Sequence, residues 1–231
     1  WPDCPFKTFL IAESETLKLS NVTILNTGNG LSWSSMLKKT LMAVKTPYVL
    51  LTMEDFFLRG SVPTTKICET LEFCIDNDVN MLRLTPRPGP KIKHRVASNI
   101  GEIQPLAPYR VSGKAAFWKT TCLLSLLDES ESLWEFEERA TERAQQVPRF
   151  YSVFIEILPY KHHVIERGLW FPWSAAKFHF MGAGIDLDAR GLMGFAHASK
   201  WVLGKLISPL WFALPLRLRE FIKPVVQVFK T

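Results

Sequence analysis

The stretch PYVLLTMEDFFL, residues 47–58, decides how the rest of the chain is interpreted. Its first half is a short apolar run in which apolar and polar residues do not alternate. Such a run is typical of a strand covered on both faces in the middle of a parallel sheet. The run ends in two acids, Glu54 and Asp55. Ligands of open α/β sheets bind beyond the carboxyl ends of the strands, and carboxylates are costly to bury there without a cation. The pair is therefore either a divalent metal site that holds a diphosphate, or a solvated acid pair that closes the strand.

Strands and helices alternate on either side of this stretch. Strands are predicted at residues 6–12, 21–26, 80–84 and 150–158, with a short one at 109–111. Helices are predicted at residues 31–44, 62–76, 114–127 and 133–146, and loops or a small hairpin at 91–107 and 159–173. This order predicts an α/β fold with a mixed, mostly parallel sheet flanked by helices. The chain opens on Trp1 and leads directly into a strand, so we expect a further strand and helix before it.

The composition is that of a folded chain. Hydrophobic residues make up 47% of the sequence and aromatic residues 12%, which excludes a disordered protein. The four cysteines have no zinc-site spacing and are predicted to be free thiols in a reducing compartment. No stretch has the pattern of a signal peptide or a membrane-spanning helix, so we expect a cytoplasmic protein.

The positive charge is concentrated near the end of the chain. Of the net charge of +6, five units lie in residues 197–231, where Lys and Arg alternate with Trp, Phe and Leu. A nucleic-acid-binding surface usually spreads its charge over a folded face, so nucleic acid is not the expected partner. A basic, aromatic tail is typical of a helical element on a membrane surface, although it could also pack back onto the domain. We therefore predict a domain at residues 1–196 and a membrane-associating amphipathic tail at 197–231.

Several motifs, taken in order, resemble those of one enzyme family. They are WPDCPFK at the start, the helix from Trp33 through Leu37 and Leu41, YVLLTMEDFFL, YRVSGKAAFWK, LWEFE, and Tyr160 followed by ERGxW at residues 166–170. The set resembles bacterial nucleotide-sugar glycosyltransferases of the GT-A type, which act in lipopolysaccharide or capsule synthesis. The resemblance covers roughly residues 1–190. It implies a GT-A-like domain that moves a sugar from a nucleotide-diphosphate donor to a glycan or lipid-linked acceptor at the inner membrane surface.

The resemblance also implies roles for particular acids. Glu54 and Asp55 take the place of the metal-binding acidic motif and would hold Mn²⁺ or Mg²⁺, but Phe56 follows where a full D-x-D motif has a second acid. Glu135 and Glu137 are the candidate catalytic bases. Residues two apart point in different directions on a helix, so we expect Glu135 to face the cleft and Glu137 to cap the helix or form a salt bridge. Both acids could instead simply favour a helix N-terminus.

The remaining site predictions concern the two substrates. Arg167, Thr27 and Trp33 are predicted to bind the donor, Arg167 through its fork of phosphate-matching donors. The predicted acceptor-binding residues are Trp134, Tyr160 and His163. Simpler alternatives are a helix-packing role for Trp33 and an exposed loop position for His163. The alternative function is a non-catalytic, membrane-peripheral interaction protein that keeps a degenerate transferase fold.

Overall fold

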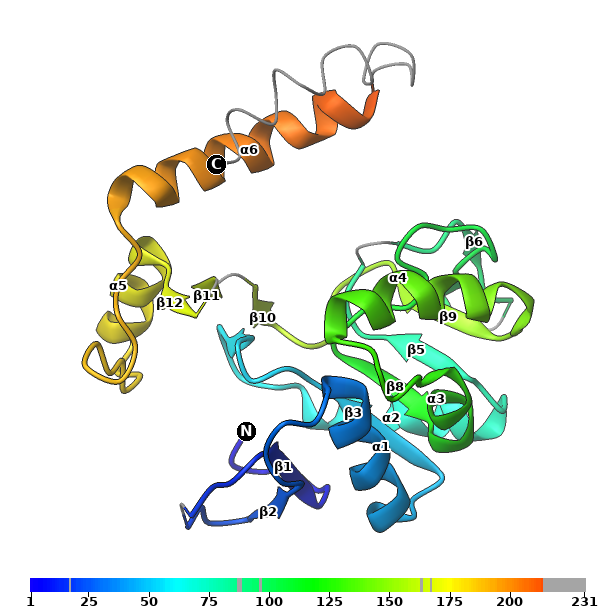
Figure 1. Cartoon of the computed structure of the whole chain (residues 1–231). Helices are drawn as coiled ribbons and strands as arrows, with labels where there is room; N and C mark the ends of the chain where they lie inside the picture. The colour runs from blue at the N-terminus through cyan, green and yellow to red at the C-terminus, as the bar shows by residue number, and fades with distance from the viewer. Residues whose placement is uncertain (17, 87–88, 96, 163, 167, 214–231) are drawn as a thin grey trace. The chain divides into compact units, whose positions relative to one another are not determined.

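The protein is described here from a computed structural model. It covers residues 1–231 except 17, 87–88, 96, 163, 167 and 214–231, and except the side chains of residues 205–213. The chain divides into two compact units, Trp1–Lys161 (unit 1) and His162–Thr231 (unit 2) (Figure 1). Each unit is described by itself.

Unit 1 contains a mixed six-stranded sheet. Its strand order is β3-β8-β5-β9-β7-β6. The strands are β3 (Tyr48–Leu51), β5 (Met81–Arg83), β6 (Ile92–Lys93), β7 (Ile100–Glu102), β8 (Ala116–Lys119) and β9 (Phe150–Val153). The pairings give β3, β5, β9 and β6 one direction, while β8 and β7 run the opposite way. The predicted mixed sheet is thus confirmed.

Two further strand pairs belong to unit 1. The parallel pair is β1 (Thr8–Ala12) with β2 (Val22–Asn26), and the antiparallel pair is β4 (Phe57–Leu58) with β10 (Tyr160–Lys161). Among the described strands, β1 pairs with β2 alone and β3 pairs with β8 alone. Each of these two strands therefore has one edge that no described strand covers.

Helices cover both faces of the six-stranded sheet. Successive strand residues point to opposite faces, and both faces of this sheet carry apolar side chains that the helices bury. The helices are α1 (Trp33–Val44), α2 (Thr64–Asp76), α3 (Thr120–Leu126) and α4 (Leu133–Arg143), followed by the 3₁₀ helix η1 (Ala144–Gln146). Met81 and Trp118 join the core formed with α1, α3 and α4. Their neighbours Leu82 and Phe117 join the core formed with α2. The sheet is therefore the middle layer of unit 1.

The position predicted for residues 48–53 is only partly right. Both faces of β3 are covered, since Val49 and Leu51 pack on one core and Tyr48 and Leu50 on the other. The strand is not in the middle of a parallel sheet, however, because it lies at one end of the strand order and runs antiparallel to β8. Burial on two faces produced the continuous apolar run, and that pattern carries no information about neighbouring strands.

Two other element predictions are wrong. Residues 114–127 form strand β8 and then helix α3 instead of one helix. The sequence AFWK of β8 has apolar residues on both faces, so its spacing fits a helix as well as a strand. No strand occupies residues 109–111, which form a turn with Tyr109 at a positive φ of 52°. Residues 91–107 do contain a small hairpin, formed by β6 and β7.

Unit 2 is small and largely helical in its described part. It contains the antiparallel pair β11 (Ile165–Glu166) and β12 (Leu169–Trp170), and the helices α5 (Pro172–Phe180) and α6 (Phe195–Ala213). Phe171, Met193 and Ala198 form its core. The boundary predicted at residue 196 falls inside α6, and residues 214–231 of the predicted tail lie outside the described residues. No described helix has both the length and the apolar character needed to cross a bilayer.

Candidate functional site

The candidate site lies at one edge of the six-stranded sheet, where β3 and β5 end and β8 begins. Leu51 and Arg83 both pair with Ala116, so the three strands are in register at this edge. The chain leaves β3 toward Glu54 and Asp55 and enters β8 through Gly113. Three loops that are far apart in sequence therefore meet at one place, which we call the sheet-end site.

Helix α4 brings Glu137 to the sheet-end site. The helix is fixed by Phe136, which is fully buried in the core next to Trp33. Glu137 follows Phe136, is half-buried, and accepts a hydrogen bond of 2.6 Å from the backbone N–H of Gly113. Burial raises the pKa of this carboxyl above its ordinary value, against the opposing effects of the Gly113 hydrogen bond and the charges of Arg83 and Lys114. Glu137 is thus a carboxyl that retains its proton more readily than an exposed one.

Gly113 allows a close approach between the loop after β3 and helix α4. A Cβ at this position would lie 3.4 Å from the Met53 methyl group, 3.5 Å from a Glu137 carboxylate oxygen and 3.2 Å from Leu133. Met53 immediately precedes Glu54, so the loop that carries Glu54 and Asp55 passes close to Gly113, which also donates to Glu137. The sheet-end site therefore includes the segments of both acidic motifs.

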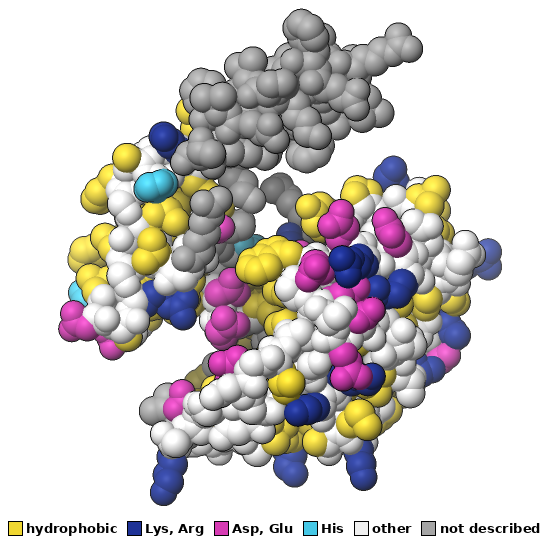
Figure 2. Space-filling view, in the orientation of Figure 1, with side chains coloured by type: hydrophobic (Ala, Val, Ile, Leu, Met, Phe, Trp, Pro, Cys, Tyr) yellow, Lys and Arg dark blue, Asp and Glu magenta, His cyan; other side chains and the backbone are white. Residues whose placement is uncertain are grey.

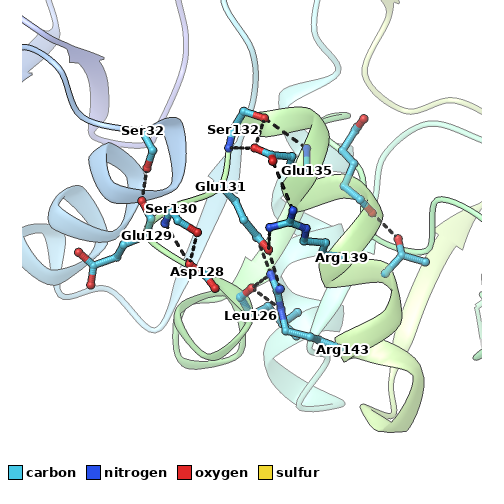
Figure 3. A network of polar contacts seen from close by, with 12 residues as sticks. Ser32, Leu126, Asp128, Glu129, Ser130, Glu131, Ser132, Glu135, Arg139 and Arg143 are labelled. Carbon is cyan, nitrogen blue, oxygen red and sulfur yellow. Dashed lines mark hydrogen bonds and ion pairs between the residues drawn. The ribbon is translucent and has the colours of Figure 1, made fainter.

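Glu135 has a different role from the one expected. Its carboxylate accepts hydrogen bonds from the Ser132 backbone and side chain, while Ser132 accepts one from the Glu135 backbone N–H, which completes a capping box. Figure 3 shows Glu135 turned back toward Ser132. These bonds lower the pKa of Glu135 below its ordinary value. The predicted orientations of the two acids are therefore reversed: Glu135 caps the helix and Glu137 faces inward.

The sequence contained a signal for this arrangement. Ser132-x-x-Glu135 is the spacing of a capping box, and it comes directly before the helix. Once Glu135 is assigned to the cap, helix geometry turns Glu137 to another side.

Arg83 is a buried cation at the sheet-end site that sequence reasoning missed. Its guanidinium donates to the backbone carbonyls of Tyr109, at 2.8 Å, and Arg110, at 2.9 Å. Burial lowers its pKa to about 10, and the charge of Glu137 partly opposes this shift. A positive charge is thereby fixed behind the Glu137 carboxylate. The only sequence signal was an arginine inside an otherwise apolar strand.

Two buried hydroxyl groups flank the same edge. Ser112 precedes Gly113, and Thr85 follows Leu84, whose backbone N–H bonds to the Ala115 carbonyl at 2.9 Å. Neither hydroxyl has a hydrogen-bond partner in the described part of the chain. Buried hydroxyls are usually paired, so each of the two is a suitable partner for a buried water.

Tyr160 lies beside the acidic loop, although it is more than a hundred residues away in sequence. Strand β10 pairs with β4 in the register Tyr160–Leu58, and the rings of Tyr160 and Phe56 are 5.9 Å apart. The Tyr160 hydroxyl also forms a hydrogen bond with the Thr52 side chain, and burial raises its pKa. Tyr160 is thus part of the surroundings of the acidic loop, and its predicted contact with an acceptor stays a prediction.

Glu54 and Asp55 differ in exposure: Glu54 is exposed and Asp55 is half-buried. Among the described residues, no group of three or more His, Cys, Asp or Glu side chains could hold a metal ion. Asp55 alone could supply one hard oxygen ligand, with Glu54 beside it, if the other ligands came from a bound diphosphate and water.

The other predicted site residues have varied positions. Thr27 follows β2, where its backbone N–H and its hydroxyl both donate to the Ala12 carbonyl, and Trp33 packs on Phe136. Trp134 is largely exposed at the start of α4, a helix rich in charged residues. Arg167 and His163 lie outside the described residues, so these two predictions stay untested.

Comparisons with known proteins identify no relative. No family model, no curated protein and no solved structure matches the chain. The assignment of function therefore rests on the sequence motifs and the sheet-end site.

Proposed function

We propose that the protein is a glycosyltransferase of the GT-A kind, with Glu137 as its catalytic base. The observation that carries the proposal is the half-buried Glu137 carboxyl with a raised pKa, held by Gly113 near the loop that follows β3. A general base works best when its pKa lies near the working pH, and burial moves Glu137 in that direction. The order of motifs in the sequence supports the same class of enzyme.

The reaction would be a single displacement. The oxygen of an acceptor hydroxyl attacks the anomeric carbon of the donor sugar while the bond from that carbon to the diphosphate breaks. Glu137 accepts the hydroxyl proton, and the nucleoside diphosphate leaves with the electron pair of the broken bond. A carboxylate acting as base suits inversion at the anomeric carbon. Arg83, behind Glu137, favours the ionised carboxylate that must receive the proton.

Asp55, with Glu54, would hold the Mn²⁺ or Mg²⁺ that neutralises the departing diphosphate. The half-buried position of Asp55 in the loop directly after β3 supports this role. The exposed Trp134 and the half-buried Tyr160 would bind the acceptor, because sugar rings stack on aromatic faces. For Arg167 and His163, and for Thr27 and Trp33, the proposed substrate contacts rest on the sequence resemblance.

The acceptor proposed is a glycan or a lipid-linked glycan of a surface polysaccharide. The basic, aromatic composition of residues 197–231 supports peripheral attachment to the inner face of the cytoplasmic membrane, where lipid-linked acceptors are found.

A nucleotide-release assay with the full chain and a panel of UDP- and GDP-sugars, with and without Mn²⁺, tests the proposal. We expect turnover of at least one donor, and a loss of about 10²–10⁴-fold in Glu137→Gln. Glu135→Gln is the matched control, because it changes an acid on the same helix turn, and we expect its rate to stay within a few-fold of wild type. The reverse ranking of the two variants would contradict the assignment of Glu137. No turnover, together with no thermal shift by nucleotide and metal, would favour the non-catalytic interaction protein.

A further inference from the structure

Unit 2 carries a connected set of aromatic side chains, of which some are buried and some are exposed. The rings of Phe171 and Trp173 are 5.3 Å apart, those of Trp173 and Phe195 are 6.1 Å apart, and those of Phe171 and Trp201 are 5.1 Å apart. Two members of this chain of contacts are open to solvent within unit 2, since Trp173 is 49% exposed and Phe195 is 65% exposed. Phe180, at the end of α5, is 88% exposed. We call Trp173, Phe180 and Phe195 the aromatic ridge.

Basic groups lie beside the aromatic ridge. Lys177 and His179 are on α5, and His197 and Lys200 are on α6, all four of them exposed. Neither α5 nor α6 contains an Asp or Glu. The acids nearest in sequence, Asp186 and Asp188, are in the turn between the helices, and the Asp186 carboxylate accepts the backbone N–H groups of Asp188 and Ala189. Figure 2 shows hydrophobic side chains with Lys, Arg and His among them over this unit.

We propose that the aromatic ridge docks on the surface of an anionic lipid bilayer. Trp and Phe side chains lower their free energy in the zone between lipid headgroups and acyl chains, and neighbouring cations are attracted to anionic headgroups. The same basic and aromatic composition continues into residues 205–231. All three ridge residues precede residue 197, so the inference extends membrane contact to the folded part of unit 2. It does not depend on the transferase activity.

Co-sedimentation of the full chain with vesicles tests the inference. Vesicles of phosphatidylcholine alone are compared with vesicles that also contain phosphatidylglycerol. The ridge variant carries Trp173→Ser, Phe180→Ser and Phe195→Ser. We expect it to bind the anionic vesicles roughly tenfold more weakly than wild type. Leu106→Ser and Ile155→Ser are matched controls, since these unit 1 side chains are 80% and 73% exposed, and we expect them to leave binding unchanged.

Three results would overturn the inference. Equal binding of the ridge variant and wild type would assign any membrane contact to residues outside the ridge. No binding by wild type would remove the membrane as the partner, and a monomer-to-dimer difference between the two proteins in sedimentation velocity would make the ridge a contact between copies.

If the triple variant loses its circular dichroism, Phe180→Ser alone is the test, because this highly exposed helix-end residue contributes little to folding. Nucleotide release with a soluble acceptor should be the same for ridge variant and wild type, which separates this inference from the transferase proposal.

Discussion

At the scale of single residues, the ionised form of Glu137 that the proposed reaction needs lowers the stability of the fold. Its pKa is raised in the folded protein, so the folded state favours the protonated form. Ionisation of Glu137 therefore costs folding free energy, even with the attraction of Arg83 included. The cost is absent below the ordinary pKa of 4.5 and grows as the pH rises through the raised pKa.

Glu137→Gln should therefore be at least as stable as wild type above neutral pH, because the uncharged amide avoids this cost and can still accept from Gly113. The advantage should disappear as the pH falls below about 4.5, where wild-type Glu137 is protonated in both states. Thermal unfolding measured as a function of pH checks this, with the exposed neighbour variant Glu138→Gln as control. A Tm of Glu137→Gln that lies well below that of the control at pH 8 would contradict the raised pKa.

Arg83 is expected to contribute strongly to stability through its two carbonyl partners. Arg83→Ala leaves the Tyr109 and Arg110 carbonyls without their donor in a buried place, so we expect a loss of ~3 kcal/mol in the free energy of unfolding. Urea unfolding measures the change. The exposed Arg139→Ala on α4 is the comparison, and a similar small effect for both variants would mean that water replaces the Arg83 guanidinium.

Sequence reasoning found the acids of the sheet-end site but not their orientations. The sequence shows which residues make up the W-E-F-E motif and the acidic pair after β3, and in what order they follow. Which of Glu135 and Glu137 faces inward depends on Ser132 forming the cap and on Gly113 donating to Glu137. The Gly113 contact joins segments that are 24 residues apart, and no pattern within one sequence reports it.

At the scale of elements, the loop before α4 holds two helices together. The Glu131 side chain is fully buried and accepts two hydrogen bonds from Arg143, at 2.7 and 2.6 Å (Figure 3). Its backbone carbonyl accepts from the Ser34 N–H in the first turn of α1, at 3.2 Å. The neighbouring Glu129 carbonyl accepts from Ser35, and the Glu129 carboxylate pairs with Lys38. These contacts join the first turn of α1 to the last turn of α4 through one loop, and so help to fix the position of Glu137.

Glu131→Ala should lower the free energy of unfolding by ~2 kcal/mol, because it removes the two charge-assisted hydrogen bonds between the buried Glu131 carboxylate and Arg143, which is exposed enough to be hydrated in the variant. Chemical denaturation gives this value, and Glu142→Ala, an exposed acid of the same helix, should cost far less. If the transferase proposal holds, Glu131→Ala should also reduce turnover while Glu142→Ala leaves it unchanged. Equal stability of the two variants would show that the buried pair makes no net contribution.

The element predictions succeeded where one periodicity dominated. Helices α1, α2 and α4 each have a polar face and an apolar face, and their predicted ranges overlap the observed ones. Strand β8 could not be separated from α3, because Phe117 and Trp118 bury on opposite sides and remove the alternation that marks a strand. The antiparallel insertion of β8 between β3 and β5 is a long-range pairing, so the sequence alone did not place β3 at the end of the sheet.

At the scale of the whole molecule, charge and apolar surface should act together on membranes. Five of the six net positive charges lie in residues 197–231, whereas the exposed aromatic ridge lies largely before them. Raising the salt concentration screens the charges but leaves apolar burial almost unchanged. We therefore expect binding of wild type to anionic vesicles to weaken with salt yet remain measurable, while the ridge variant loses binding completely at high salt. A salt titration of the sedimentation assay checks this, and identical salt curves for the two proteins would contradict a two-part attachment.

The division into two units was not predicted in its observed place. Composition located the change at residue 197, where positive charge begins to dominate, but contacts divide the chain after Lys161. The distribution of charge describes the surface of a protein. The division into units depends instead on which residues pack in the same core. Phe171, Met193 and Ala198 form such a core on both sides of the boundary that composition predicted.

The edges of β1 and β3 that no described strand covers have one more consequence. A strand that pairs on one side alone keeps every second amide and carbonyl pointing outward, where any extended peptide can bind to them. Deuterium should enter these outward amides quickly and enter the central strand β5 slowly. In concentrated solution a second molecule could pair with the same backbone groups and begin edge-to-edge aggregation. A charged substitution next to β3 should therefore be the simplest way to prevent this aggregation.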